Sequence, residues 1–322
     1  MRLHLHIGNH KTGSTAIQSV LDKNSSLLKE RNVIYPKTGE VAGAHHGLVA
    51  ALKASTSESF RMHTNMSEER KPSFERLLAN LTAECKEYED VILSSEEFFN
   101  SATLDSTKCE RLLSEFESVN VICYLRNQPD HIESSYKFSI AWEKEAENRS
   151  FADYLEFQLN SKYHEYLPTI EYWESFNNTN VRCCSFDEKK AHLIASFFSF
   201  IDKSDLTKEI DLTHLSRNSS PSPFETTIIR ALKEISSPLS IKELINNLKE
   251  EPQNPTNINT LYTYDEFIKV RDKFKASNEK LLEKYGININ KHVPDPRTKN
   301  FVNINSLGKI KTLKDLVTVL MR

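Results

Sequence analysis

Long apolar runs, an excess of charge of one sign and a paired set of cysteines are all missing from this sequence. Because no run approaches the roughly 18 apolar residues of a membrane-spanning helix, we expect no membrane span. The 42 lysines and arginines nearly balance the 45 aspartates and glutamates, which argues against a general nucleic-acid binder. The five cysteines are scattered, odd in number and without metal-type spacing, which fits a reducing compartment. The sequence therefore predicts a soluble, cytoplasmic protein.

The order of apolar patterns along the 322 residues predicts an α/β protein. Strand-like and helical segments alternate, which favours right-handed βαβ units around a central, mainly parallel sheet flanked by helices. Strands are expected at residues 2–7, 90–99, 119–126 and 180–186. Helices are expected at residues 14–30, 44–55, 72–87, 107–117, from 129, 151–159, 167–176, 192–201, 224–235, 241–250 and 264–285. We expect one domain over residues 1–322, with an α/β core at 2–205 and a mainly helical C-terminal extension at 206–322.

One stretch near the start, LHLHIGNHKTGSTAIQ at residues 3–18, indicates a short strand, a glycine-bounded loop and then a helix. Apolar residues alternate before Gly8, as a strand requires, and recur at helical spacing from Ser14 onward. A strand that feeds a loop opening a helix leaves several backbone N–H groups without partners near one point, which suits a phosphate. A signal peptide is not expected, because the loop already begins at Gly8.

The spacing of this loop departs from the Walker A pattern G-x-x-x-x-G-K-[ST] in one respect. Gly8 and Gly13 have the required separation, but Ser14 and Thr15 follow directly and the lysine lies earlier, at Lys11. A kinase places this lysine on the β- and γ-phosphates. A lysine inside the loop would instead lie beside the inner phosphate and any group that leaves from it. The alternatives are a loop that binds a simple anion and a chance match.

A second polar pattern follows the strand expected at 119–126. Arg126 ends this strand, and Ser134 faces out of the next helix eight residues later. Ligands of open α/β sheets bind outside the carboxyl ends of the strands, so we expect Arg126 at the ligand edge. A guanidinium grips a phosphate through two parallel hydrogen bonds, and Ser134 would add a hydroxyl. The alternative is an arginine in a structural ion pair beside serines on a solvated helix face.

Together these two patterns resemble the phosphate sites of PAPS-dependent sulfotransferases, in particular the bacterial, carbohydrate-type branch; PAPS is 3′-phosphoadenosine 5′-phosphosulfate. The loop is similar to the family's 5′-phosphosulfate loop, and Arg126 with Ser134 is similar to its 3′-phosphate site. The resemblance covers most of residues 2–285 and implies a P-loop NTPase-like three-layer fold, PAPS as cosubstrate, no metal, and a hydroxyl-bearing acceptor such as a sugar. It implies that Lys11 stabilises the departing bridging oxygen. The 5′-phosphate would be held by Thr12, Gly13, Ser14 and Thr15.

Transfer to a hydroxyl also requires a group within hydrogen-bond reach that removes its proton. Glu96 ranks first, because it lies at a strand end beside the loop and the family often has Ser-Ser-Glu there. His46 ranks second, since it opens a helix that should border the same cleft. The alternatives are a capping or ion-paired role for Glu96 and a surface position for His46. The alternation of His4, His6 and His10 indicates strand packing, and no metal site is expected.

A looser match lies at Arg217-Asn-Ser-Ser-Pro221, where Asn218 is similar to part of a loop that closes on the nucleotide in the family. A simple helix-capping turn explains the same residues. The leading hypothesis is a sulfotransferase that works by in-line, metal-independent transfer. The alternatives are a P-loop small-molecule kinase and a catalytically inactive nucleotide-binding scaffold. The missing lysine after Gly13 and the missing Walker B aspartate favour the sulfotransferase over the kinase.

Overall fold

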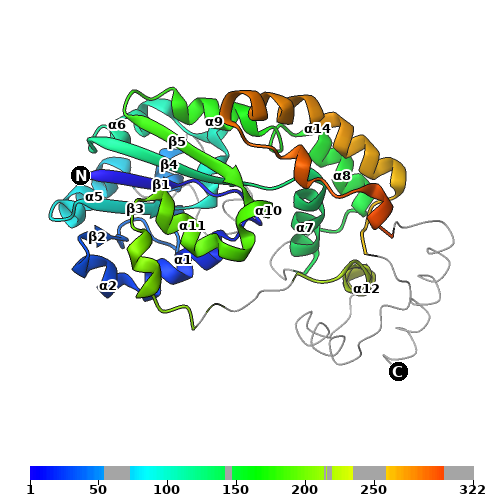
Figure 1. Ribbon diagram of the computed structural model, residues 1–322, viewed down its shortest axis with the longest axis horizontal. Coiled ribbons are helices and arrows are strands. Elements are labelled where there is room, and N and C mark those ends of the chain that lie inside the picture. Colours follow the sequence, from blue (N-terminus) through cyan, green and yellow to red (C-terminus); the bar gives the residue numbers. More distant parts are fainter. Residues whose placement is uncertain (54–72, 142–146, 214, 216–219, 235–258, 301–322) are drawn as a thin grey trace. The chain divides into compact units, whose positions relative to one another are not determined.

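The structure is a computed structural model that describes residues 1–53, 73–141, 147–213, 215, 220–234 and 259–300 (Figure 1). The helix expected at 241–250 and the candidate residue Asn218 lie outside these residues. The chain divides into two compact units. The first comprises Met1–Arg126, Glu165–Ser216 and Lys280–Ile289, and the second comprises Asn127–His164, Arg217–Glu279 and Asn290–Arg322. The expectation of a single domain stays a prediction.

A parallel sheet of five strands forms the centre of the first unit. Its strands are β1 (Arg2–His6), β2 (Val33–Ile34), β3 (Asp90–Ser94), β4 (Ser118–Leu125) and β5 (Thr179–Ser185). They lie in the order β2-β3-β1-β4-β5, so β1 is central and pairs with both β3 and β4. Parallel strands covered on both faces are apolar throughout, and the last five residues of β4 are all buried. The predicted parallel sheet is confirmed.

Helices flank this sheet (Figure 1). They are α1 (Ser14–Lys23), α2 (Ser25–Glu30), α3 (His46–Leu52), α5 (Phe74–Cys85), α6 (Ser106–Leu113), α9 (Tyr166–Glu174), α10 (Phe186–Lys189) and α11 (Leu193–Phe200). Ile17 and Leu21 of α1 share one buried cluster with Phe197 of α11 and Tyr124 of β4. Burial of these apolar stripes against the sheet confirms the predicted α/β class.

The single helix expected at 14–30 is two helices, because Asn24 interrupts it. Asn24 is buried, and its Nδ2 donates to Val20 O at 2.9 Å and to Asp211 O at 3.2 Å. Its Oδ1 accepts a hydrogen bond from Asp211 N at 2.8 Å. A side-chain amide that takes backbone partners in this way competes with the helical hydrogen bonds and ends α1.

Two strand boundaries also differ from expectation. β2 has only two residues, too few to show alternation, and the sequence does not predict it. β3 ends at Ser94 rather than at residue 99. Ser95 Oγ accepts from Glu97 N at 3.2 Å and caps a 3₁₀ helix, η2 (Glu96–Phe99). The chain therefore turns at the carboxyl end of β3, the edge where α/β sheets bind ligands.

The second unit contains α7 (Gln128–Ala141), α8 (Phe151–Asn160), α12 (Pro223–Glu234) and part of α14 (Tyr264–Tyr285). Their buried side chains form one apolar cluster, which includes Ile132, Tyr136, Leu155, Phe267 and Phe274. The predicted helical C-terminal extension is confirmed for α12 and α14. As expected, α14 ends before Gly286, which adopts a left-handed φ of 70°.

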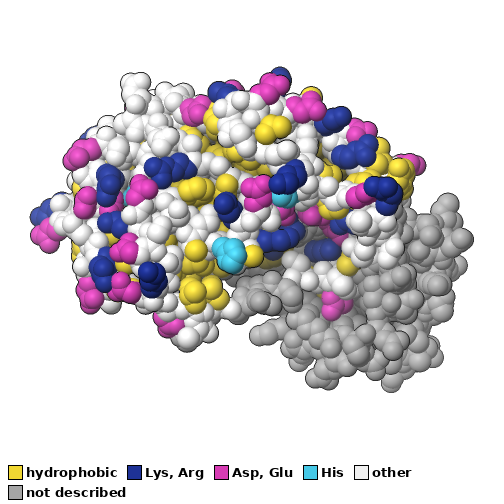
Figure 2. Space-filling model, viewed as in Figure 1, with side chains coloured by type: hydrophobic (Ala, Val, Ile, Leu, Met, Phe, Trp, Pro, Cys, Tyr) yellow, Lys and Arg dark blue, Asp and Glu magenta, His cyan; other side chains and the backbone are white. Residues whose placement is uncertain are grey.

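Charged side chains of both signs are interspersed over the face of the molecule that Figure 2 shows. This mixture is what the near balance of 42 basic and 45 acidic residues predicts. No helix in the described part of the chain is long and apolar enough to cross a lipid bilayer.

Candidate functional site

The loop between β1 and α1 folds around three left-handed backbone positions. Gly8, Lys11 and Gly13 have φ values of 53°, 62° and 83°. Glycine adopts this conformation freely, whereas a lysine does so at a cost in free energy and must be held by its surroundings. Thr12 supplies part of that support, because its buried hydroxyl donates to Asn9 O at 2.6 Å and accepts from Asn9 N at 3.3 Å. The Thr12 hydroxyl therefore closes the loop.

The loop ends in donors that lack an acceptor in the described protein. The N–H groups of Gly13, Ser14 and Thr15 make no backbone hydrogen bond among the described residues. Ser14 is 5% exposed, and its hydroxyl has no hydrogen-bond partner there either. Buried polar groups are almost always paired, so the buried Ser14 hydroxyl indicates a polar ligand, and the N–H groups at the start of α1, which lack intrahelical partners as in any helix, suit its acceptor oxygens. The positive end of the α1 dipole favours an anion.

Two cations lie beside these donors. Arg126 follows β4 directly and donates from Nη1 to the Lys11 carbonyl at 3.3 Å, and its Cζ lies 5.7 Å from the centre of the Phe186 ring. Tyr166 donates to the Arg126 carbonyl at 2.7 Å. Burial lowers the pKa of Lys11, and the Arg126 charge lowers it further. Arg126 Nε is buried without a hydrogen-bond partner among the described residues. An anion bound here would offset the repulsion between the two cations.

Gly8 separates the start of α1 from Glu96. A Cβ atom built on Gly8 would lie 2.7 Å from Ser14 Oγ and 3.2 Å from Glu96 Cα, so both residues pack against this glycine. The Glu96 carboxylate accepts from Gln18 Nε2 at 3.1 Å. Burial raises the pKa of Glu96, but the charges of two nearby histidines and this hydrogen bond outweigh burial and place the pKa below its ordinary value. Glu96 is therefore held as a carboxylate beside the loop.

The histidines that act on this carboxylate are His10 and His46. His46 begins α3 and places Nδ1 2.8 Å from Ser95 Oγ. His10 lies in the loop rather than in the strand, and its Nε2 is 3.6 Å from Glu97 Oε1. Glu97 Oε2 pairs at 2.7 Å with Nζ of the fully buried Lys53. The predicted residue His46 is thus at the site, and His10 joins it.

Three other histidines have structural contacts. His45 Nδ1 accepts from Ser94 N at 3.1 Å, and burial lowers the pKa of His45 to about 4. His6 Nδ1 lies 2.8 Å from Ser94 Oγ, and burial lowers the pKa of His6 to about 4 as well. His4 Nε2 lies 3.0 Å from Asp90, an acidic partner that the sequence does not indicate. The expectation of strand packing fits His4 and His6.

Most of the predicted site residues belong to the first unit, namely Lys11, Thr12, Gly13, Ser14, Thr15, His46, Glu96 and Arg126. Ser134 lies on α7 in the second unit and is 9% exposed. Its partnership with Arg126 at a 3′-phosphate stays a prediction, as does the role of Asn218. The roles of the other residues are argued below from their geometry.

Sequence reasoning missed Gln18 and Lys53. Gln18 lies four residues after Ser14 and hence on the same face of α1, and this spacing is the signal by which it could be found. Lys53 carries no such signal, because only the fold brings it to Glu97.

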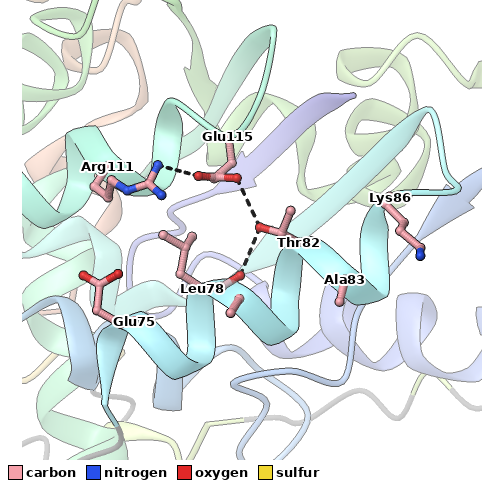
Figure 3. Close-up of a pocket in the computed structure, with 8 residues that line it drawn as sticks. Glu75, Leu78, Thr82, Ala83, Lys86, Arg111 and Glu115 are labelled. Atoms are coloured by element: carbon pink, nitrogen blue, oxygen red, sulfur yellow. Dashed lines mark hydrogen bonds and ion pairs between the residues drawn. The ribbon is translucent and has the colours of Figure 1, made fainter.

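A surface groove lies between α5 and α6 (Figure 3). It is lined by Glu75, Leu78, Ala79, Thr82, Ala83, Lys86, Arg111 and Glu115, none of which belongs to the loop. Arg111 Nη1 lies 2.5 Å from Glu115, which also accepts from the Thr82 hydroxyl at 3.3 Å (Figure 3). Arg111, Glu115 and Thr82 thus contact one another at the surface, whereas the loop contains a buried hydroxyl without a partner among the described residues.

No protein-family model matches the chain. An uncharacterised protein of Archaeoglobus fulgidus is 28% identical over 207 residues, which are 61% of this chain and 53% of the relative, so the chain spans about half of that protein's length. The solved sulfotransferase domain from the Synechococcus PCC 7002 olefin synthase is 11% identical and covers 77% of this chain and 94% of that domain, with a TM-score of 0.33. At this similarity, neither fold nor function follows from the neighbour.

Proposed function

We propose that this protein transfers the sulfuryl group of PAPS to a hydroxyl group of an acceptor. A carbohydrate or glycoconjugate is the acceptor class that the resemblance of its motifs implies. The observation that carries the proposal is the position of Lys11 inside a loop with unpartnered donors, with the Glu96 carboxylate across Gly8. Transfer to a hydroxyl requires this combination of an anion site and a nearby proton acceptor.

The nucleotide would be held by donors of the first unit. The N–H groups of Gly13, Ser14 and Thr15, with the Ser14 hydroxyl, would bind the 5′-phosphate, because they have no acceptor among the described residues. Arg126 would bind the 3′-phosphate, and its unpartnered Nε supports this role. Ser134 and Asn218 are the further residues proposed here.

Lys11 and Glu96 would act at opposite ends of the transfer. PAPS supplies an activated sulfuryl group that leaves a phosphate behind. The Lys11 ammonium stabilises the charge that develops on that phosphate, and the partly buried position that lowers its pKa strengthens this effect. A Glu96 carboxylate oxygen takes the proton from the acceptor hydroxyl, with His46 as the second candidate. Acceptor oxygen and leaving phosphate would lie on opposite sides of sulfur, and the residues assigned here need no metal.

The test is a calorimetric titration of the full chain with 3′,5′-ADP and, separately, with ATP, each in EDTA and in Mg²⁺. We expect metal-independent binding of 3′,5′-ADP and little binding of ATP, because only the former carries the 3′-phosphate that Arg126 would hold. Preference for Mg-ATP would overturn the roles of Lys11 and Arg126 and favour a small-molecule kinase.

Transfer itself is tested with ³⁵S-labelled PAPS and a panel of sugars and glycoconjugates. We expect label in a sugar product with the wild-type protein and its loss in Glu96→Gln, which keeps the shape of the side chain but cannot take the proton. Binding of 3′,5′-ADP without transfer to any member of the panel would favour an inactive scaffold.

A further inference from the structure

The geometry points to Gln18 as the positioning residue for the Glu96 carboxylate, an inference that rests on the proposed function. Gln18 lies in the second turn of α1 and is 7% exposed. Its Nε2 donates to Glu96 Oε2 at 3.1 Å and to Ser94 Oγ at 3.2 Å. Both amide hydrogens thus have an acceptor, which fixes the direction that the amide faces. The carboxylate is therefore oriented before any acceptor binds.

Ser94, which accepts a hydrogen bond from Gln18, is itself held by a buried histidine. Ser94 Oγ accepts from Gln18 and lies 2.8 Å from His6 Nδ1 on the central strand β1. Burial lowers the pKa of His6 to about 4, so this ring is neutral at pH 7 and its Nδ1 can accept the single hydrogen of the Ser94 hydroxyl. Gln18 then donates to both Glu96 and Ser94, and Ser94 donates to His6, so each of these donors has an acceptor, and such a network resists rearrangement.

The same helix also carries the phosphate-binding donors. Ser14 and Gln18 are four residues apart and share one face of α1, which is a rigid element. Ser14 would contact the 5′-phosphate, while Gln18 orients the group that would take the proton. Gly8 packs against both Ser14 and Glu96, since a Cβ there would lie 2.7 Å from Ser14 Oγ and 3.2 Å from Glu96 Cα. One helix thus sets the separation of leaving phosphate and base, on which an in-line transfer depends.

Two substitutions test this role, with Ser19→Ala as control because Ser19 is a half-buried residue of the same helix. Gln18→Met keeps an unbranched side chain of similar length but removes the donor, and Gln18→Glu places a second carboxylate beside Glu96. We expect Gln18→Met and the control to bind 3′,5′-ADP like the wild type. Turnover of PAPS to 3′,5′-ADP, with the acceptor found in the sugar panel, should fall by about tenfold to a hundredfold in Gln18→Met. Turnover of PAPS should fall further in Gln18→Glu.

A readout independent of turnover is the pKa of Glu96, measured by NMR of ¹³C-labelled glutamate carboxylates and assigned with Glu96→Gln. We expect Gln18→Met to raise this pKa, because removal of the donor leaves burial opposed by fewer favourable contacts, whereas Ser19→Ala leaves it unchanged. An unchanged pKa in Gln18→Met would overturn the inference. Equal losses of nucleotide affinity and turnover would overturn it as well, because they indicate a structural role.

The outcome also separates this inference from the proposed function. An active wild type with no change in the Glu96 pKa of Gln18→Met refutes the role of Gln18 alone. A wild type that neither binds 3′,5′-ADP nor turns over PAPS refutes the proposed function, and with it any positioning role in that reaction.

Discussion

Replacement of Gly8 by alanine probes the packing between the phosphate loop and Glu96. Gly8 has a φ of 53°, and the added Cβ would lie 2.7 Å from Ser14 Oγ and 3.2 Å from Glu96 Cα. The first contact can be relieved by rotation of a side chain, but the second requires a shift of backbone. The left-handed conformation costs alanine about 1–2 kcal/mol, and overpacking adds about 1–3 kcal/mol. We therefore expect the free energy of unfolding to fall by about 2–5 kcal/mol.

Gly286→Ala provides the matched control. Gly286 has a similar φ of 70°, but no described atom would lie within 4 Å of its added Cβ. The free energy of unfolding of this variant should fall only by the cost of the left-handed backbone conformation, about 1–2 kcal/mol. Urea unfolding measures both losses, and the loss in Gly8→Ala minus the loss in Gly286→Ala is the cost of packing the added Cβ against Ser14 and Glu96. Equal losses in the two variants would refute the tight packing of Gly8 against Ser14 and Glu96.

The same Gly8→Ala protein should also bind nucleotide more weakly. Displacement of the Ser14 hydroxyl removes one hydrogen bond to a charged ligand, which is worth about 1.5–3 kcal/mol, or roughly a tenfold to hundredfold loss of affinity. Calorimetric titration with 3′,5′-ADP measures this loss, with Gly286→Ala again as control. Wild-type affinity in Gly8→Ala would show that Ser14 Oγ does not face the nucleotide.

Three further outcomes are expected. Lys11→Ala should lower PAPS turnover far more than affinity for 3′,5′-ADP, and equal losses would contradict a role toward the leaving group. Arg126→Ala should abolish the preference for 3′-phosphorylated nucleotide in the calorimetric titration, and survival of that preference would place the 3′-phosphate elsewhere. His6 and His45 are buried with pKa values of about 4, below the unfolded value of about 6.5. Their contribution to stability is complete above pH 6.5 and is lost as the pH falls toward 4, with a slope of about 2.7 kcal/mol per pH unit. Urea unfolding between pH 7 and pH 4 measures the total slope, to which His164 adds because burial lowers its pKa to about 3, so a slope below about 2.7 kcal/mol per pH unit would contradict the prediction.

The parts of the fold that the sequence predicts are those with local signals. β1 and β4 are continuous or alternating apolar segments, and the loop has fixed glycine spacing, so neighbours along the chain are sufficient to identify them. The two-residue strand β2 exists through its pairing with β3, which no local pattern shows. The helix break at Asn24 likewise depends on Asp211, a residue far along the chain.

The candidate site divides in the same way. Lys11 and Arg126 are predictable, because one lies within a recognisable loop and the other ends a buried strand at the ligand edge. The contact between them is not predictable, since it joins the residue after β4 to the carbonyl of Lys11 in the loop after the neighbouring strand β1. Lys53 donates to Glu97 and Gln18 donates to Glu96, both in η2. These partners follow only from the three-dimensional structure, because they are distant along the chain.

The choice of base between Glu96 and His46 depends on where the hydrogens lie. Ser95 Oγ accepts from Glu97 N at 3.2 Å and lies 2.8 Å from His46 Nδ1. If the Ser95 hydroxyl donates to Nδ1, the neutral His46 ring carries its hydrogen on Nε2, and that nitrogen cannot accept a proton.

Glu96 has no such restriction. Burial raises its pKa, but the charges of His10 and His46 and the hydrogen bond from Gln18 outweigh burial, so Glu96 is a carboxylate throughout the neutral range. We therefore expect kcat for PAPS turnover to stay constant from pH 8 down to about pH 5, and Glu96→Gln to lower it by about a hundredfold or more. His46→Gln should retain kcat at neutral pH, and any acid limb should move to higher pH, because this variant loses one charge that lowers the pKa of Glu96. An acid limb near the free-histidine pKa of about 6.5 that disappears in His46→Gln would assign the base to His46 instead.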